Sequence, residues 1–116
     1  MVLAVVDDLM FTSKIKAAAR QLGVDVAFVR SSDAALAAMQ TNSPALVILD
    51  LNNPRTNPLG IVAGMKDNPA LASIPTVAFV SHVQTDLIDA AHAAGVDDVL
   101  PRSAFTARLT EILTGR

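Results

Sequence analysis

The feature that most constrains the fold is a set of short runs in which every side chain is apolar. Residues 46–49 form one such run, and they leave no polar face. A strand without a polar face must be covered on both sides, as in a parallel sheet between two layers of helices. This run ends in Asp50, at the position where open α/β sheets place their ligands. Because Asp also starts many turns, Asp50 by itself does not distinguish a binding site from a turn.

Further runs of the same kind alternate with helical patterns along the chain. In Phe11, Ile15, Ala18 and Leu22 the apolar residues recur every three or four positions, which predicts an amphipathic helix. Strands and helices that alternate with short connections predict right-handed crossovers and one parallel sheet. The predicted fold class is α/β, a three-layer (βα)5 flavodoxin-like doubly wound sheet with strand order 2-1-3-4-5. The expected strands are residues 2–6, 25–29, 46–50, 76–80 and 96–100.

The helix boundaries are predicted from capping residues and helix breakers. Thr12 or Ser13 is expected to cap the first helix, and the segment 31–33 is typical of a second helix N-terminus. A short third helix is expected over residues 59–66, weakened by its glycines. A last amphipathic helix is expected to carry Phe105, Leu109, Ile112 and Leu113.

The composition indicates one well-filled aliphatic core. Hydrophobic residues make up 52% of the chain and charged residues 17%, so we expect a single domain over residues 1–116. The absence of cysteine excludes disulfides and thiolate metal sites, and it fits a reducing compartment. The net charge is −2 and there is no basic run, so neither nucleic acid nor an anionic membrane is an expected partner. We therefore expect a soluble cytoplasmic protein.

Polar residues follow the predicted strands in an order that indicates phosphoryl chemistry. Three carboxylates at one edge of a sheet repel one another unless a cation or a proton compensates them, and Mg²⁺ suits such an oxygen site. One carboxylate is then able to attack phosphorus, and a hydroxyl and a cation opposite would receive the phosphoryl oxygens. Each residue also has a simpler interpretation as a helix cap, a turn or a solvated charge. The residues are Asp7 and Asp8, Asp50, Ser81 and Arg102.

Nucleotide-binding sites and flavin-binding sites fit the sequence less well. No glycine-rich phosphate loop follows any predicted strand, which weighs against dinucleotide and P-loop sites. The chain has no Trp or Tyr to stack on a flavin, so a small flavodoxin-like enzyme or cofactor carrier is a weak alternative. We expect a protein that is not an enzyme.

The chain resembles the receiver domains of two-component response regulators over essentially its whole length. The motifs that carry the resemblance are Val5-Val6-Asp7-Asp8, Leu49-Asp50 with Pro54, Ser81, residues 95–100, and Arg102 before Phe105. The resemblance implies that Asp50 accepts a phosphoryl group from a histidine kinase and that Ser81 senses it. It also implies that Asp7 and Asp8 hold Mg²⁺, with Asp8 the direct ligand, and that Asn52 contributes its backbone carbonyl.

The sequence departs from the family pattern at several positions. Arg102 replaces the usual lysine, and Ser103 the usual proline; arginine keeps the charge but is not equivalent to lysine. The segment 57–58 replaces an aspartate-glycine turn, Ser81 lies one residue later than usual, and Val99 or Leu100 replaces an aromatic residue. These departures favour an alternative, a pseudo-receiver that acts as a phosphorylation-independent docking module.

The resemblance also predicts how the signal leaves the molecule. A stand-alone receiver would act through a downstream protein partner that binds the face of the fourth helix, fifth strand and fifth helix. A homodimer is left open by the sequence. The kinase, the partner and the pathway are not identified by it.

Overall fold

The computed structural model describes residues 1–81 and 84–115. Its sheet is parallel throughout, with the strand order β2-β1-β3-β4-β5, so the predicted fold class and strand order are confirmed. Runs without a polar face became strands because both faces of this sheet are covered. The strands are β1 (Val2–Val5), β2 (Val26–Val29), β3 (Leu46–Asp50), β4 (Thr76–Val80) and β5 (Asp98–Pro101).

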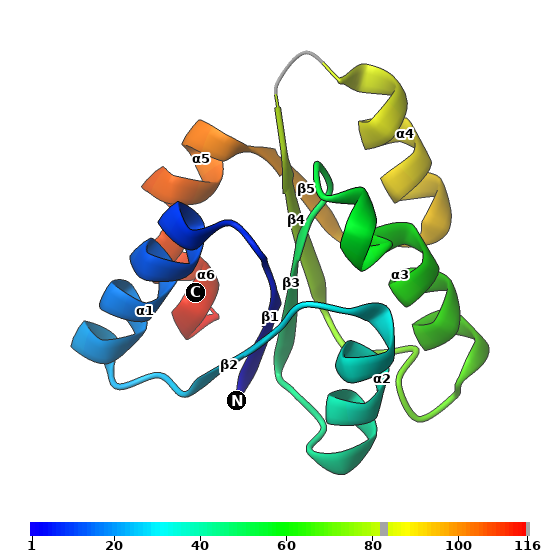
Figure 1. Ribbon diagram of the computed structural model, residues 1–116, viewed down its shortest axis with the longest axis horizontal. Coiled ribbons are helices and arrows are strands. Elements are labelled where there is room, and N and C mark those ends of the chain that lie inside the picture. Colours follow the sequence, from blue (N-terminus) through cyan, green and yellow to red (C-terminus); the bar gives the residue numbers. More distant parts are fainter. Residues whose placement is uncertain (82–83, 116) are drawn as a thin grey trace.

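Helices cover both faces of the sheet (Figure 1). In the figure α1, α5 and α6 lie on one side of the strands, and α2, α3 and α4 lie on the other. The helices are α1 (Leu9–Leu22), α2 (Ser32–Thr41), α3 (Pro58–Asp67), α4 (Thr85–Ala94), α5 (Arg102–Ala107) and α6 (Leu109–Thr114), with a 3₁₀ turn η1 (Pro54–Thr56) before α3. Within the described part of the chain, no helix is long and apolar enough to cross a membrane.

Side-chain alternation along the strands divides the interior into two cores. Leu49 packs in the core under α2, α3 and α4, whereas Ile48 packs in the core under α1, α5 and α6. The second core contains three neighbouring rings: Phe79 stacks on Phe11 at 4.6 Å and lies tilted against Phe105 at 4.7 Å, measured between ring centroids. These rings lie directly beneath the carboxyl end of the sheet, so they support the residues that follow the strands.

The strand register resolves where Ser81 lies. Asp50 on β3 pairs with Phe79 on β4, and Val80 pairs with Pro101 on β5. Ser81 and Arg102 each directly follow that last pair, so they leave the sheet at the same level. The register places Ser81 level with Arg102, and the role of the Ser81 hydroxyl stays a prediction.

Two expectations about helix ends are corrected by the structure. Neither Thr12 nor Ser13 caps α1; the helix begins earlier, and Asp8 accepts hydrogen bonds from the backbone N–H groups of Met10 (2.8 Å) and Phe11 (3.3 Å). The last helix is interrupted at Arg108, where φ is −102° and ψ is 13°, giving α5 and α6 in place of one helix.

Two other helix starts follow from local polar residues. Ser31 caps α2 through a 3.1 Å bond from the backbone N–H of Ala34, as the sequence predicts. Asn57 has φ of 50°, in the left-handed region that Asn tolerates, and its side chain accepts from the N–H of Gly60. The 57–58 step therefore turns the chain sharply from η1 into α3.

Candidate functional site

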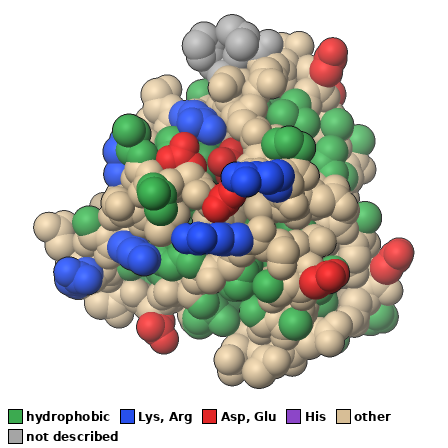
Figure 2. Space-filling view, in the orientation of Figure 1, with side chains coloured by type: hydrophobic (Ala, Val, Ile, Leu, Met, Phe, Trp, Pro, Cys, Tyr) green, Lys and Arg blue, Asp and Glu red, His purple; other side chains and the backbone are tan. Residues whose placement is uncertain are grey.

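A hollow of about 380 Å³ opens at the carboxyl ends of β1 and β3. Figure 2 shows acidic side chains gathered inside a depression, with basic side chains around it. The arrangement follows from topology, because the connections after β1 and β3 leave in opposite directions and part the two loops. The hollow is lined by Asp7, Asp8, Asp50, Asn52, Asn53, Pro54, Arg55 and Arg102.

Asp50 is the most deeply placed acid of the site, with only 3% of its surface exposed. Its Oδ1 accepts a 2.9 Å hydrogen bond from the backbone N–H of Asn52 and faces the Nη2 of Arg102 at 3.7 Å. Burial raises the pKa of Asp50 above its ordinary value of 3.8. The Asn52 N–H and the Arg102 charge oppose this increase in pKa, and the Asp8 charge adds to it.

This raised pKa predicts how the stability of the protein depends on pH. The unfolded chain ionises Asp50 at a lower pH than the folded chain, so stability falls as the pH rises through the unfolded and then the folded pKa. Asp50→Asn in EDTA should therefore raise the melting temperature at pH 7. The gain should shrink as the pH falls toward 3.8. Thermal melts of both proteins across this pH range test it, and a gain that does not depend on pH would contradict it.

Asp8 and Asp7 follow β1 but face different partners. Asp8 uses Oδ1 to cap α1, and its Oδ2 lies 4.0 Å from Nη1 of Arg102. Asp7 is held by two arginines, Arg55 at 2.5 Å and Arg30 at 3.6 Å. The cap interpretation and the site interpretation of Asp8 are therefore compatible, because each uses a different oxygen.

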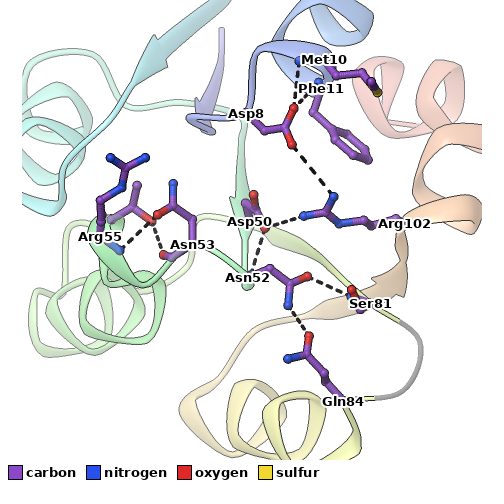
Figure 3. A network of polar contacts seen from close by, with 11 residues as sticks. Asp8, Met10, Phe11, Asp50, Asn52, Asn53, Arg55, Ser81, Gln84 and Arg102 are labelled. Carbon is purple, nitrogen blue, oxygen red and sulfur yellow. Dashed lines mark hydrogen bonds and ion pairs between the residues drawn. The ribbon is translucent and has the colours of Figure 1, made fainter.

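Arg102 lies between Asp8 and Asp50, as Figure 3 shows. Its guanidinium carbon is 5.0 Å from the centroid of the Phe11 ring and 5.7 Å from that of Phe79. Within the described chain its Nε is buried and has no hydrogen-bond partner. Aromatic rings attract a guanidinium through their faces, so the side chain is positioned by packing as well as by charge.

Ser81 is connected to Asp50 through Asn52. The side-chain oxygen of Asn52 accepts a 2.9 Å bond from the backbone N–H of Ser81, and its amide nitrogen donates to Gln84 (Figure 3). Because Gln84 immediately precedes α4, this amide connects the loop after β3 to the start of that helix. The Ser81 hydroxyl is not needed for this link, which uses its backbone.

The donor atoms at the edge of the hollow suit a hard divalent cation. Mg²⁺ prefers oxygen ligands and keeps several waters, and the loops supply carboxylates from Asp8 and Asp50 and a carbonyl from Asn52. No group of three or more acidic or histidine side chains able to hold a metal occurs among residues 1–81 and 84–115. A metal site here would therefore depend on few protein ligands and on water. The participation of Asp7 stays a prediction.

The sequence did not identify three residues that contribute to the site, Arg30, Arg55 and Gln84. Arg30 directly follows β2, the strand beside β1, and Arg55 follows the proline after β3. The strand-end rule that selected the acids would have found Arg30 if it had been applied to β2. Gln84 carries no such signal, because its role depends on the position of Asn52.

Several solved structures share this fold. A response regulator from Hahella chejuensis is 24% identical with a TM-score of 0.86, covering 97% of this chain and 91% of that one. The phosphorylated cyanobacterial phytochrome response regulator RcpA is 26% identical with a TM-score of 0.80, covering 98% and 88%. The Mn²⁺-bound form of response regulator Rcp1 is 23% identical with a TM-score of 0.79, covering 96% and 89%.

The sequence comparisons agree with the structural ones at the level of the family. No curated protein sequence matches the chain. The sequence pattern of the response regulator receiver domain matches residues 2–114, which is nearly the whole chain. The chain therefore belongs to the response regulator receiver domain family.

Proposed function

We propose that Asp50 accepts a phosphoryl group from the phosphohistidine of a histidine kinase. The observation that carries the proposal is the buried Asp50 carboxylate at the end of β3, open to the hollow and facing a cationic side chain at 3.7 Å. Its Oδ1 makes the contacts with Asn52 and Arg102, so Oδ2 is the oxygen we assign to the attack. Family membership supports this role, because phosphoryl acceptance on aspartate is the activity that the family implies.

The transfer is a substitution at phosphorus. An ionised oxygen of Asp50 forms the new O–P bond, the N–P bond of the donor breaks, and its electron pair returns to the imidazole nitrogen. The product is an acyl phosphate on Asp50, whose extra negative charge lies beside Arg102. A guanidinium binds phosphoryl oxygens through charge-assisted hydrogen bonds, so Arg102 would stabilise the product.

A divalent cation, which we take to be Mg²⁺, would be held by Asp8, Asp50 and the Asn52 carbonyl, with Asp7 nearby. When bound, it supplies positive charge against the phosphoryl oxygens. One structural relative carries Mn²⁺, which is consistent with an oxygen-lined cation site in this fold.

The output would pass through the loop between β4 and α4. The backbone N–H of Asn52 donates to Asp50, and the Asn52 side chain bonds Ser81 and Gln84. A change at Asp50 would therefore reach the start of α4 through two hydrogen bonds, Asp50–Asn52 and Asn52–Gln84. We propose that Ser81 and Arg102 turn toward the phosphoryl group and that a partner protein recognises the altered α4, β5 and α5 surface. In this account the protein signals and is not itself an enzyme.

The test is incubation of the folded protein with phosphoramidate and Mg²⁺, followed by intact-mass measurement. One phosphoryl group per chain, located on Asp50 by peptide mapping, supports the proposal. No incorporation by folded protein contradicts it.

A second candidate function is a phosphorylation-independent docking module. Arg102 already lies between Asp8 and Asp50, so the acids of the site are partly neutralised without a phosphoryl group or a metal. This candidate predicts that Asp50→Ala leaves partner binding unchanged. Loss of binding in that variant would count against it.

A further inference from the structure

Each carboxylate of the hollow faces an arginine of the same chain. Arg102 faces Asp8 at 4.0 Å and Asp50 at 3.7 Å. Asp7 carries the closest pair of the site, 2.5 Å to Arg55, with Arg30 at 3.6 Å. Three carboxylates are thus matched by three guanidiniums, and the repulsion among the acids is compensated within the protein.

The two arginine groups are held in different ways. Arg102 is half-exposed and lies over the Phe11 and Phe79 rings, so its position is constrained by the core beneath it. Arg55 is mostly exposed, but its backbone N–H donates to Asn53, and Pro54 fixes the turn that carries it over Asp7. The Arg102 side chain is therefore positioned by the rings beneath it, and the Arg55 guanidinium by a fixed backbone and its ion pair with Asp7.

We propose that these arginines lower the affinity of the site for divalent cations. Arg55 and Arg30 do so by forming ion pairs with Asp7. The inference rests on the proposed function, since it concerns the same hollow. A divalent ion near Asp7 must either displace the guanidinium of Arg55 or remain beside a like charge, and both reduce binding. Arg102 opposes the ion in the same way at Asp8 and Asp50.

The proposal predicts a graded increase in metal affinity when the arginines are removed. Arg55→Ala should lower the dissociation constant for Mn²⁺ roughly two- to fivefold, the range expected for an exposed ion pair. Arg102→Ala should lower it by about tenfold, because a half-buried charge is screened less by salt. The double variant should bind more tightly than either single variant. Binding is measured by titration of Mn²⁺ at low ionic strength, without any phosphodonor.

Matched controls separate this effect from a general change in charge. Arg108→Ala removes an arginine that pairs with Glu111 outside the hollow, so its affinity should equal that of the unaltered protein. Arg55→Lys keeps the positive charge, so its dissociation constant for Mn²⁺ should also stay close to that of the unaltered protein. Thermal melts confirm that each variant is folded.

The outcomes decide the proposal independently of phosphoryl transfer. Tighter Mn²⁺ binding by Arg55→Ala and Arg102→Ala, with no change in Arg108→Ala, supports it. An unchanged dissociation constant in Arg55→Ala, an equal gain in Arg108→Ala, or no binding by any variant overturns it. Because no phosphodonor is present, failure of Asp50 labelling would contradict the proposed function and leave this measurement unaffected.

Discussion

Asparagine in place of Asp50 is expected to abolish phosphoryl incorporation from phosphoramidate. The amide oxygen of asparagine is neutral and does not form a stable bond to phosphorus, whereas the carboxylate does. The substitution keeps the size of the side chain and an oxygen that accepts from the Asn52 N–H, so the fold should be preserved. Intact-mass measurement after incubation with phosphoramidate and Mg²⁺ should show no phosphorylated Asp50→Asn protein.

Asp67→Asn provides the matched control for this loss. Asp67 is an exposed aspartate at the end of α3, so the same change there should leave incorporation at the level of the unaltered protein. Incorporation that persists in Asp50→Asn would move the acceptor to another residue, with Asp8 the first to be mapped. Loss in both variants would show that the assay responds to something other than the acceptor.

Alanine in place of Phe79 is expected to lower the free energy of unfolding by about 3–5 kcal/mol. Phe79 is fully buried and lies against the rings of both Phe11 and Phe105, so its removal leaves a cavity at the centre of that core. The Phe79 ring lies under Arg102, and residue Phe79 on β4 pairs with Asp50 on β3. The cavity would therefore form directly beneath the site. Urea unfolding followed by circular dichroism measures the change.

Phe28→Ala is the comparison for that substitution. Phe28 lies on the edge strand β2, is only partly buried and belongs to the periphery of the same core. Its loss should cost clearly less than the loss of Phe79, since neighbouring side chains and solvent fill the space. Equal costs for the two would mean that the cluster of three phenylalanine rings does not dominate this core.

Much of the fold was predictable because local pattern and global topology agree. The all-apolar runs required two-sided cover, and this condition selected a parallel sheet before any contact was known. The acids after β1 and β3 then marked the edge where the ligand site lies. Thr12 and Ser13 were the wrong cap residues for α1, whereas the cap interpretation of Asp8, which competed with its role in the site, is confirmed.

The pairing of charges in the hollow was not predictable from sequence. Arg55 and Asp7 are 48 residues apart in the chain, and no local pattern links them. The bridge that Asn52 makes to Ser81 and Gln84 depends in the same way on how two loops meet. Such contacts depend on where side chains lie in three dimensions, and the order of residues in the sequence does not specify those positions.

The sequence by itself determined the α/β class and the acids that follow the strands, because hydrophobic periodicity and the position of strand ends follow from residue order. The strand order was expected from the flavodoxin-like pattern, and the structure confirms it. Only the tertiary structure decided that Arg102 lies between Asp8 and Asp50 and that Arg55 and Arg30 engage Asp7. The reason is physical: electrostatic compensation depends on distances of a few ångströms between residues far apart in the chain.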